Sequence, residues 1–331
     1  MRQLMLIIRA PLRITLGGGG TDIPSYYSAY GGFTVTAAID KYVYIVAHDR
    51  FDPEFRISYS KTEIVEKIAN ISHPIFREAL RLLDFSQGLE LISIADLPAK
   101  TGLGSSGAFT VALLNALHAW KKERVPPSIL AEEACHIIMD KLKEPSGKQD
   151  EYTAAYGGIH SYTITMDGAV NVNPLKISRT TTSELETRLL LFYTGITRES
   201  KLVLESQYKV AAQKKPTPIE YYHRIKQIGL DSRSALENGD IDKFGLLLRD
   251  HWETKKALAP TATTPEIDSI YDLAMKNGAT GGKIMGAGGG GFFMFHCNAD
   301  RSKLTHAMQN HGLRRIEFRF EYDGSKMIID I

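Results

Sequence analysis

The sequence predicts an α+β protein of two lobes. Its 331 residues are enough for one large domain or two medium ones. Strand-like runs separated by turn signals dominate the first hundred residues, and they do not alternate with helices as regular βαβ units would. From about residue 176 the chain passes through the polar run SRTTTS and becomes mainly helical. We therefore place the two lobes at residues 1–177 and 178–331.

The first lobe is expected to combine short strands with a few core helices. Hydrophobic patterning predicts strands at residues 4–8, 32–38, 42–47, 55–59, 89–94, 160–165 and 169–172, and a further strand at 189–193 beyond the lobe boundary. It predicts helices over 74–83, 108–120 and 128–142. The second of these is apolar on nearly every face, so it should lie in the core. We expect Ser128 to cap the third, with Glu132 and Glu133 in its first turn.

Capping signals predict the elements of the second lobe. Asn238-Gly239 should end one helix, and Asp240 should cap the next, whose apolar residues share one face. Thr264 and Pro265 should open another helix, which stops near residue 277. A strand is expected at 292–296. The tail is predicted to form a hairpin of residues 316–320 and 327–331, with Asp323-Gly324 at its turn.

Composition favours small-molecule chemistry. The formal net charge is +2 with both signs interspersed, which argues against nucleic acid or an anionic membrane as a partner. Cys135 and Cys297 are far apart in sequence and should be buried thiols. The apolar run before Arg9 is too short for a signal peptide or a membrane span, and it predicts a first strand. We expect a cytoplasmic protein.

Residues 98–108 (PAKTGLGSSGA) are the most informative segment, because they join a predicted strand to the apolar core helix. Glycines 102, 104 and 107 allow an anion to approach the backbone N–H groups at the helix N-terminus. The run also fits the dinucleotide pattern G-x-G-x-x-G. No second strand ending in an acid follows, so that interpretation is weakened but stays open. A Walker A loop is excluded, since no Lys-Ser or Lys-Thr follows the last glycine.

Two other glycine runs indicate a ligand pocket. In residues 10–22 a strand leads into four consecutive glycines. Four glycines lose much conformational entropy on folding, and a simple turn needs one or two at most. Asp22 follows and could accept hydrogen bonds from ligand hydroxyls; a loop tip with a capping aspartate is the alternative. Residues 281–291 (GGKIMGAGGGG) lead into a strand, not a helix, and are interpreted as a second wall of an anion or sugar pocket.

Together these motifs resemble the GHMP small-molecule kinases. Pro-x-Arg with Gly-rich-Thr-Asp, then PxxxGLGSSG, then KxMGAGGGG occur in the family's order across residues 9–291. The resemblance implies a ribosomal protein S5-like N-terminal domain and an α/β C-terminal domain. GGGGTD and residues 146–152 (SGKQDEY) are most similar to the D-glycero-D-manno-heptose kinases, which phosphorylate the anomeric hydroxyl of heptose 7-phosphate for capsule or lipopolysaccharide precursors.

Three alternatives stay open at this point. The chain could act on another sugar or sugar phosphate, such as a galactose- or fucose-like acceptor. It could be a non-catalytic family member that binds sugar or nucleotide, although Arg13 and Asp150 are both retained. It could also be a nucleotide-dependent oxidoreductase built on residues 89–120.

The resemblance implies specific roles for residues. Asp150, expected in a loop after the helix predicted at 128–142, would accept the proton of the acceptor hydroxyl, with Arg13 holding it ionised and neutralising developing charge. The nucleotide site would comprise Lys100, Thr101, Gly102, Leu103, Gly104, Ser105, Ser106 and Gly107. The acceptor site would comprise Gly18, Gly19, Gly20, Thr21, Asp22, Arg198, Gly288 and Gly289. Arg198 and Lys255-Lys256 would bind a phosphate on the acceptor, unless they are solvated surface charges.

The implied cofactors are ATP and Mg²⁺, with Ser106 as the metal ligand. Relatives pair this serine with a glutamate about a dozen residues before the catalytic aspartate, whereas this chain has Ile138 and Met139 there. Mg²⁺ keeps most of its waters, so an outer-sphere arrangement would still work. Asp140 is the nearest acidic residue but lies on another part of the helix face. The expected partner is a small-molecule sugar phosphate, and a homodimer is left open.

Overall fold

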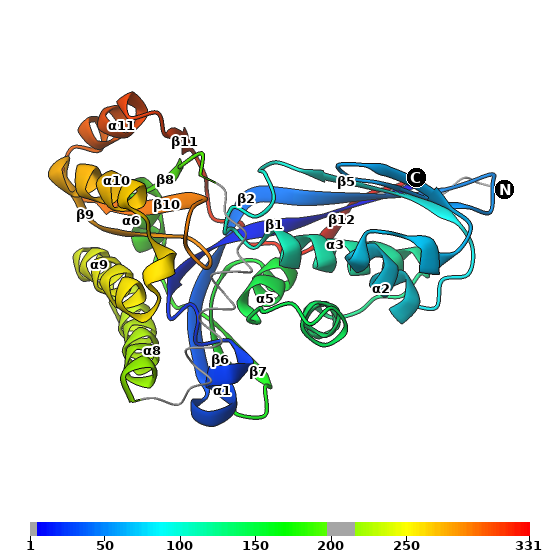
Figure 1. Cartoon of the computed structure of the whole chain (residues 1–331), viewed down its shortest axis with the longest axis horizontal. Coiled ribbons are helices and arrows are strands. Elements are labelled where there is room, and N and C mark those ends of the chain that lie inside the picture. The colour runs from blue at the N-terminus through cyan, green and yellow to red at the C-terminus, as the bar shows by residue number, and fades with distance from the viewer. Residues whose placement is uncertain (1–4, 197–215) are drawn as a thin grey trace.

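The computed structural model describes residues 5–196 and 216–331. It contains an eight-stranded sheet and a four-stranded sheet, each covered by helices, as Figure 1 shows. The predicted α+β class is therefore confirmed. The larger sheet extends away from the smaller one, and helices α8 and α9 stand beside the junction between them (Figure 1).

Two long antiparallel strands form the spine of the larger sheet. Strand β1 (Met5–Gly17) pairs along its whole length with β2 (Gly32–Asp49). Two separate strands were predicted within residues 32–47, but β2 is continuous and changes its partner halfway. Its first half pairs with β6 and its second half with β5. The remaining strands on this side are β3 (Phe55–Ser58), β4 (Thr62–Val65), β5 (Leu89–Ala95), β6 (Ile159–Ile164) and β7 (Val170–Pro174).

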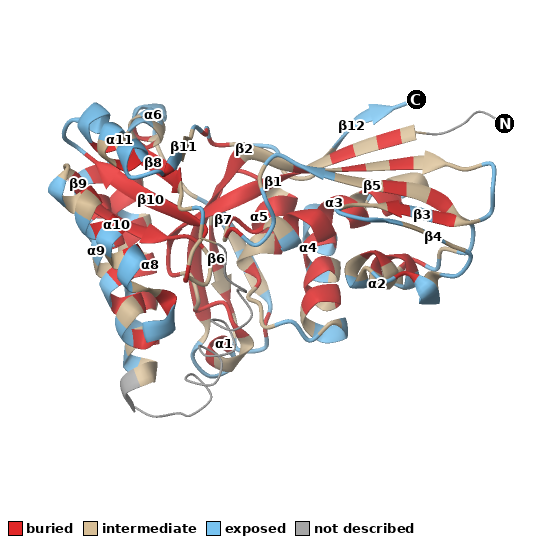
Figure 2. Cartoon of the chain, turned by 45° about the horizontal axis from the view of Figure 1, so that its top comes forward, coloured by how far each residue is buried: buried red, intermediate tan, exposed pale blue. Residues whose placement is uncertain are grey.

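Helix α3 (Ser105–Trp120) fills the core beneath this sheet. Eleven of its 16 residues are buried, in line with the core position that the apolar sequence predicted, and it packs on β1 and β2 (Figure 2). It begins three residues earlier than expected, directly after Gly104. Helices α2 (Pro74–Leu82), α4 (Pro127–Cys135) and α5 (Gln149–Tyr156) pack against it. The first 174 residues also contain α1 (Pro24–Tyr30), the 3-10 turn Ile68–Asn70 and a π-helical segment (His136–Lys141).

The predicted cap of α4 is wrong. The N-cap is Pro126, Pro127 occupies the first turn, and no side chain caps the helix. Proline needs no N–H partner there, and its fixed φ already suits a helix, so Ser128 lies inside the first turn. That turn also holds no acidic residue, because Glu132 and Glu133 come later in the helix.

The smaller sheet has the order β11-β8-β10-β9. Its strands are β8 (Leu189–Tyr193), β9 (Ala279–Ile284), β10 (Phe292–Cys297) and β11 (Arg314–Ile316). The surrounding helices are α6 (Arg179–Arg188), α8 (Pro216–Glu237), α9 (Ile241–Leu258), the 3-10 turn Pro260–Ala262, α10 (Pro265–Lys276) and α11 (Arg301–Asn310). The predicted caps are confirmed: Asp240 accepts from Lys243 N, and Thr264 accepts from Ile267 N.

The predicted C-terminal hairpin is wrong. Strand β11 pairs with β8, and the last strand, β12 (Lys326–Asp330), pairs antiparallel with β1 instead. In Figure 1 it lies beside β1 at the edge of the larger sheet. The long outer edge of β1 offers backbone hydrogen bonds that outweigh the local turn signal of Asp323-Gly324. The larger sheet thus includes the end of the chain, and the division at 177/178 stays a prediction.

The polar run taken as a lobe boundary begins a helix. Ser178 caps α6 by accepting a hydrogen bond from Thr181 N.

Cys135 and Cys297 are buried free thiols, as predicted. Within residues 5–196 and 216–331, no helix has both the length and the apolar character that a membrane crossing requires.

Candidate active site

The three glycine motifs meet around one cavity of about 390 Å³ at the junction of the two sheets. Such a volume lies within the range of small-molecule sites. Strand β1 contributes Arg13 and Thr15, and the first glycine run contributes Gly19 and Gly20. The remaining polar lining includes Asp22, Lys100, Gly102, Gly104, Ser105, Ser106, Glu144, Gln149, Asp150, His251, Lys255, Lys283 and Gly286.

The loop before α3 has the geometry of an anion site. Gly104 is the N-cap and has a left-handed backbone (φ 76°), with no side chain capping the helix. The first backbone N–H groups of α3 therefore have no side-chain acceptor, while Ser105 and Ser106 face the cavity from the first turn. Gly102 also has positive φ, and it packs against the third glycine run, where a Cβ would lie 2.4 Å from the Met285 carbonyl oxygen.

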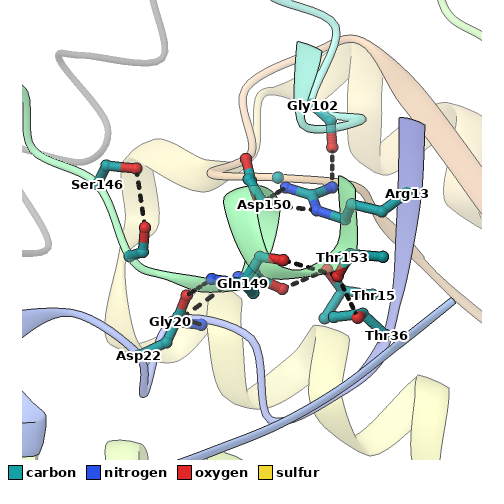
Figure 3. A network of polar contacts seen from close by, with 12 residues as sticks. Arg13, Thr15, Gly20, Asp22, Thr36, Gly102, Ser146, Gln149, Asp150 and Thr153 are labelled. Carbon is teal, nitrogen blue, oxygen red and sulfur yellow. Dashed lines mark hydrogen bonds and ion pairs between the residues drawn. The ribbon is translucent and has the colours of Figure 1, made fainter. Parts of the chain in front are cut away.

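Arg13 links this loop to Asp150. Its Nε and Nη2 lie 2.8 and 2.7 Å from the same oxygen of Asp150, and its Nη1 donates to the carbonyl of Gly102 at 2.5 Å (Figure 3). The guanidinium is nearly buried, whereas the Asp150 side chain is about a quarter exposed toward the cavity. Asp150 lies in the first turn of α5, not in a loop as predicted. The carboxylate is thus held by a fixed cation and still reaches a ligand.

Asp22 is oriented by the chain itself. It is buried, and its oxygens accept hydrogen bonds from the backbone N–H groups of Gly20 and Gln149 and from the Gln149 side chain (Figure 3). Burial raises the pKa of Asp22, and the nearby Asp150 charge adds to this. The residue lines the cavity, as predicted, while also fixing the turn before α5.

Glu151 follows Asp150 in α5 and lies close to the Arg13–Asp150 pair. It is buried, and its Oε2 has no hydrogen-bond partner within the described residues. Burial, reinforced by the charge of Asp150, raises the pKa of Glu151 to about 8. At neutral pH it is therefore mainly a neutral acid, which leaves Asp150 as the carboxylate that pairs with Arg13.

A basic cluster faces the cavity from the smaller lobe. His251 and Lys255 are one turn apart on α9, and Lys283 comes from β9. Lys283 Nζ lies 3.3 Å from Nδ1 of His251, where an ammonium group can donate to a neutral imidazole. Lys255 donates to the carbonyl of Gly286 in the third glycine run. Neither Lys283 nor His251 was predicted as a site residue from the sequence, although Lys283 lies within the third glycine run.

Seven of the predicted site residues do not line the cavity: Gly18, Thr21, Thr101, Leu103, Gly107, Gly288 and Gly289. Their structural contacts explain why. The Thr21 hydroxyl bonds the carbonyls of Gly18 and Phe33, and Leu103 belongs to the core. Gly107 lets α5 approach α3, since a Cβ there would lie 2.8 Å from that of Asp150. These residues shape the site from behind, and a direct contact with ligand stays a prediction for them.

The third glycine run contacts protein on its outer side. Gly289 N donates to the carbonyl of Ala262, and a Cβ on Gly288 would meet the same residue. Of residues 281–291, Lys283, Gly286 and Ala287 line the cavity. The remaining predicted contact, Arg198, lies outside the described residues.

Ile138 occupies the wall where relatives were expected to carry a glutamate. The carboxylates that line the cavity within the described residues are Asp22, Glu144 and Asp150. No group of three or more His, Cys, Asp or Glu side chains in this part of the chain could hold a metal ion. A cation here must therefore take most of its ligands from water and phosphate.

Comparison with known proteins identifies the family. The model of the GHMP kinases N terminal domain matches residues 63–158, and that of the GHMP kinases C terminal region matches 232–313. The D-glycero-alpha-D-manno-heptose 7-phosphate kinase of Campylobacter jejuni is 31% identical over 96% of this chain and 97% of that protein. The chain belongs to the GHMP kinase family. It is therefore an ATP-dependent phosphotransferase that acts on a hydroxyl group, and the dinucleotide interpretation of residues 102–107 is wrong.

Solved structures of other GHMP kinases have the same fold. A D-glycero-D-manno-heptose 1-phosphate kinase from Bacteroides thetaiotaomicron superposes with a TM-score of 0.81 and 27% identity, covering 98% of this chain and 99% of that chain. Lactococcus lactis galactokinase, at 17% identity, shares the fold with a TM-score of 0.77 over 97% of this chain and 95% of its own. The predicted two-lobed GHMP kinase fold is confirmed.

Proposed function

We propose that this kinase transfers the γ-phosphate of ATP to the anomeric hydroxyl of D-glycero-D-manno-heptose 7-phosphate. The observation that carries the proposal is the Arg13–Asp150 pair, which faces the same cavity as the anion site at the N-terminus of α3. The full-length similarity to a kinase named for this acceptor supports the choice of sugar.

Asp150 would act as the general base. Its carboxylate would accept the proton of the sugar hydroxyl, while Arg13 holds it in place and offsets charge that develops on the transferring group. Most of the catalysis in phosphoryl transfer comes from such positioning and charge neutralisation. The Gly102–Ser106 turn would hold the nucleotide phosphates. The apolar wall of Pro74, Ile75, Ile138 and Leu142 suits the base of the nucleotide.

Magnesium fits the donors that the chain provides. Ser106 is exposed at the first turn of α3, and Glu144 lines the same cavity with an exposed side chain and no partner within the described residues. Mg²⁺ is commonly held by one or two carboxylates together with phosphates and water. Ser106 and Glu144 would therefore hold the ion, which supplies charge neutralisation between the phosphates. Glu144→Gln should raise the Mg²⁺ concentration needed for half-maximal rate.

The test is a phosphorylation assay with ATP and Mg²⁺ across heptose 7-phosphate, heptose 1-phosphate, unphosphorylated heptose, galactose and fucose. The two heptose-kinase relatives carry names that differ in the phosphate position, so both heptose phosphates belong in the panel. We expect heptose 7-phosphate to have the highest kcat/KM, and phosphorus NMR to show the new ester on the anomeric carbon. A preference for another sugar, or an ester elsewhere, would overturn the proposal.

The setting of the reaction follows from the same proposal. The product would feed capsule or lipopolysaccharide precursors, which places the enzyme in the cytoplasm, where ATP is available. Cell fractionation checks the location, and light scattering checks whether the chain forms the homodimer left open by its sequence.

A further inference from the structure

We propose that His251, Lys255 and Lys283 form the subsite for the phosphate group that the acceptor already carries. This inference rests on the proposed function, because it assumes a phosphorylated sugar. It adds a binding role for two residues, His251 and Lys283, that the motif analysis did not assign.

The cluster is built into the wall of the cavity. Helix α9 packs closely against β9, which places His251 and Lys255 on the same side as Lys283. All three line the cavity, and they are 1%, 8% and 3% exposed, respectively. They come from rigid elements, so the three nitrogens converge without rearrangement of a loop.

These lysines lack a counter-charge within the described residues. The Lys255 ammonium meets only a backbone carbonyl, and Lys283 meets the ring of His251. Arg13, the other buried cation here, is by contrast paired with Asp150. Burying an unpaired ammonium is costly, so such groups are normally paired or shift toward the neutral form. The pocket should therefore bind an anion, which would supply the missing counter-charge.

The electrostatics agree with this geometry. Burial, with the charge of Arg13, lowers the pKa of Lys255 to about 7. Burial and the charges of Lys255 and Arg13 lower the pKa of Lys283 well below its usual range, and burial with both lysines does the same to His251. A phosphate dianion would reverse these shifts by supplying the missing opposite charge.

The acceptor is a better occupant than the nucleotide. Nucleotide phosphates already have the α3 N-terminus and its serines. The basic cluster instead lies near the first glycine run, since the backbone of Gly19 partly offsets the lowering of the His251 pKa by burial and by the two lysines, and both residues line the cavity. Gly19 and Gly20 line the cavity beside Asp22, which is the part of the site assigned to the sugar. A phosphorylated sugar would then span from Asp150 to the lysines.

The test compares Lys255→Met and Lys283→Met with Lys243→Met, an exposed lysine at the other end of α9. We expect each cavity variant to raise KM for heptose 7-phosphate by about tenfold to a hundredfold, the range for hydrogen bonds to charged groups. KM for ATP and kcat/KM for unphosphorylated heptose should change less than twofold. If KM for ATP rose more than KM for heptose 7-phosphate, the cluster would serve the nucleotide and the proposal would be overturned. An unchanged KM for both substrates would also overturn it.

Binding without turnover separates this proposal from the proposed function. Inorganic phosphate should raise the melting temperature of the wild type and of Lys243→Met but not that of Lys283→Met. If the wild type phosphorylated no heptose yet showed this pattern, the proposed acceptor would be wrong and the anion subsite would stand. Equal stabilisation of all three proteins would refute the subsite. Methionine removes a buried amine, so these variants should fold.

Discussion

Two nitrogens of Arg13 contact a single oxygen of Asp150, while the third nitrogen of the guanidinium bonds the carbonyl of Gly102. One side chain thus ties together strand β1, helix α5 and the phosphate loop. No hydrogen bond to the second carboxylate oxygen of Asp150 is made by the described residues, so in the proposed reaction this oxygen would face the acceptor. The arrangement explains how three segments that are far apart in sequence form one site.

Replacing Asp150 should abolish most of the turnover while preserving the fold. Loss of a general base typically reduces rate by 10²- to 10⁴-fold, so we expect Asp150→Ala to lower kcat by that factor. The nucleotide site lies on another element, so ADP affinity measured by calorimetry should change less than threefold. Turnover near that of the wild type would contradict the role given to this carboxylate.

The contact between the phosphate loop and the third glycine run should be sensitive to a single methyl group. A Cβ at Gly102 would lie 2.4 Å from the Met285 carbonyl, and the residue has φ of 84°. Gly102→Ala should therefore lower kcat/KM for ATP at least tenfold and destabilise the protein by about 1–3 kcal/mol. Steady-state kinetics and thermal unfolding measure both effects.

Gly195 provides the matched control for this substitution. It has a similar backbone angle (φ 73°), but an added Cβ would meet no atom of the described residues within 4 Å. Gly195→Ala should therefore show the backbone strain alone, about 1 kcal/mol, with kcat/KM for ATP unchanged. Equal kinetic effects of the two substitutions would mean that contact between the loops is unimportant.

Local sequence patterns correctly predicted helices and helix caps, because these features depend on interactions between residues that are close in sequence. An apolar segment too long for a strand gave α3, and Asp240 and Thr264 gave the starts of α9 and α10. The C-terminal hairpin failed because the partner of β12 is β1, more than three hundred residues away in sequence. A turn signal carries no information about such a distant edge.

The site was predicted in the same uneven way. The glycine runs located the cavity, because their cost in chain entropy requires a reason. The Ser-Gly-Lys-Gln-Asp segment was assigned to the site only through the resemblance to the GHMP kinases. Lys283 was missed since a single lysine in a glycine-rich run is indistinguishable from a solvated one. Its burial follows from the packing of α9 on β9, which the sequence does not reveal.

His118 should make stability depend on pH. Its two ring nitrogens lie 2.7 and 2.8 Å from carboxylates of Glu123 and Glu133, so both can donate only when the ring is protonated. The hydrogen bond to Glu133 is the main cause that raises the pKa of His118. The resulting stability is fully present below the unfolded-state pKa of about 6.5 and is lost as pH rises through the folded-state value.

Unfolding in denaturant at several pH values measures this contribution. His118→Gln should lower the free energy of unfolding by about 1–3 kcal/mol at pH 6, and the difference should narrow by pH 9. His136→Gln serves as the control, because His136 and its partner Asp140 are both exposed and such pairs contribute little. A difference between wild type and His118→Gln that did not vary with pH would show a packing effect only.

Glu151 should also make stability fall as pH rises, but for a different reason: its burial favours the neutral acid over the carboxylate. Burial raises the pKa of Glu151 from 4.5 to about 8, so between these values the unfolded chain releases a proton that the folded protein keeps. The native state then binds more protons than the unfolded state, and stability falls as pH rises from about 4.5 to 8.

Glu151→Gln keeps the shape of the neutral acid and removes this titration. We expect the variant to match the wild type at pH 4.5 and to exceed it by a few kcal/mol at pH 8, at about 1.4 kcal/mol per pKa unit. If the difference in free energy of unfolding between the wild type and Glu151→Gln stayed constant across this pH range, Glu151 would be ionised in the folded protein.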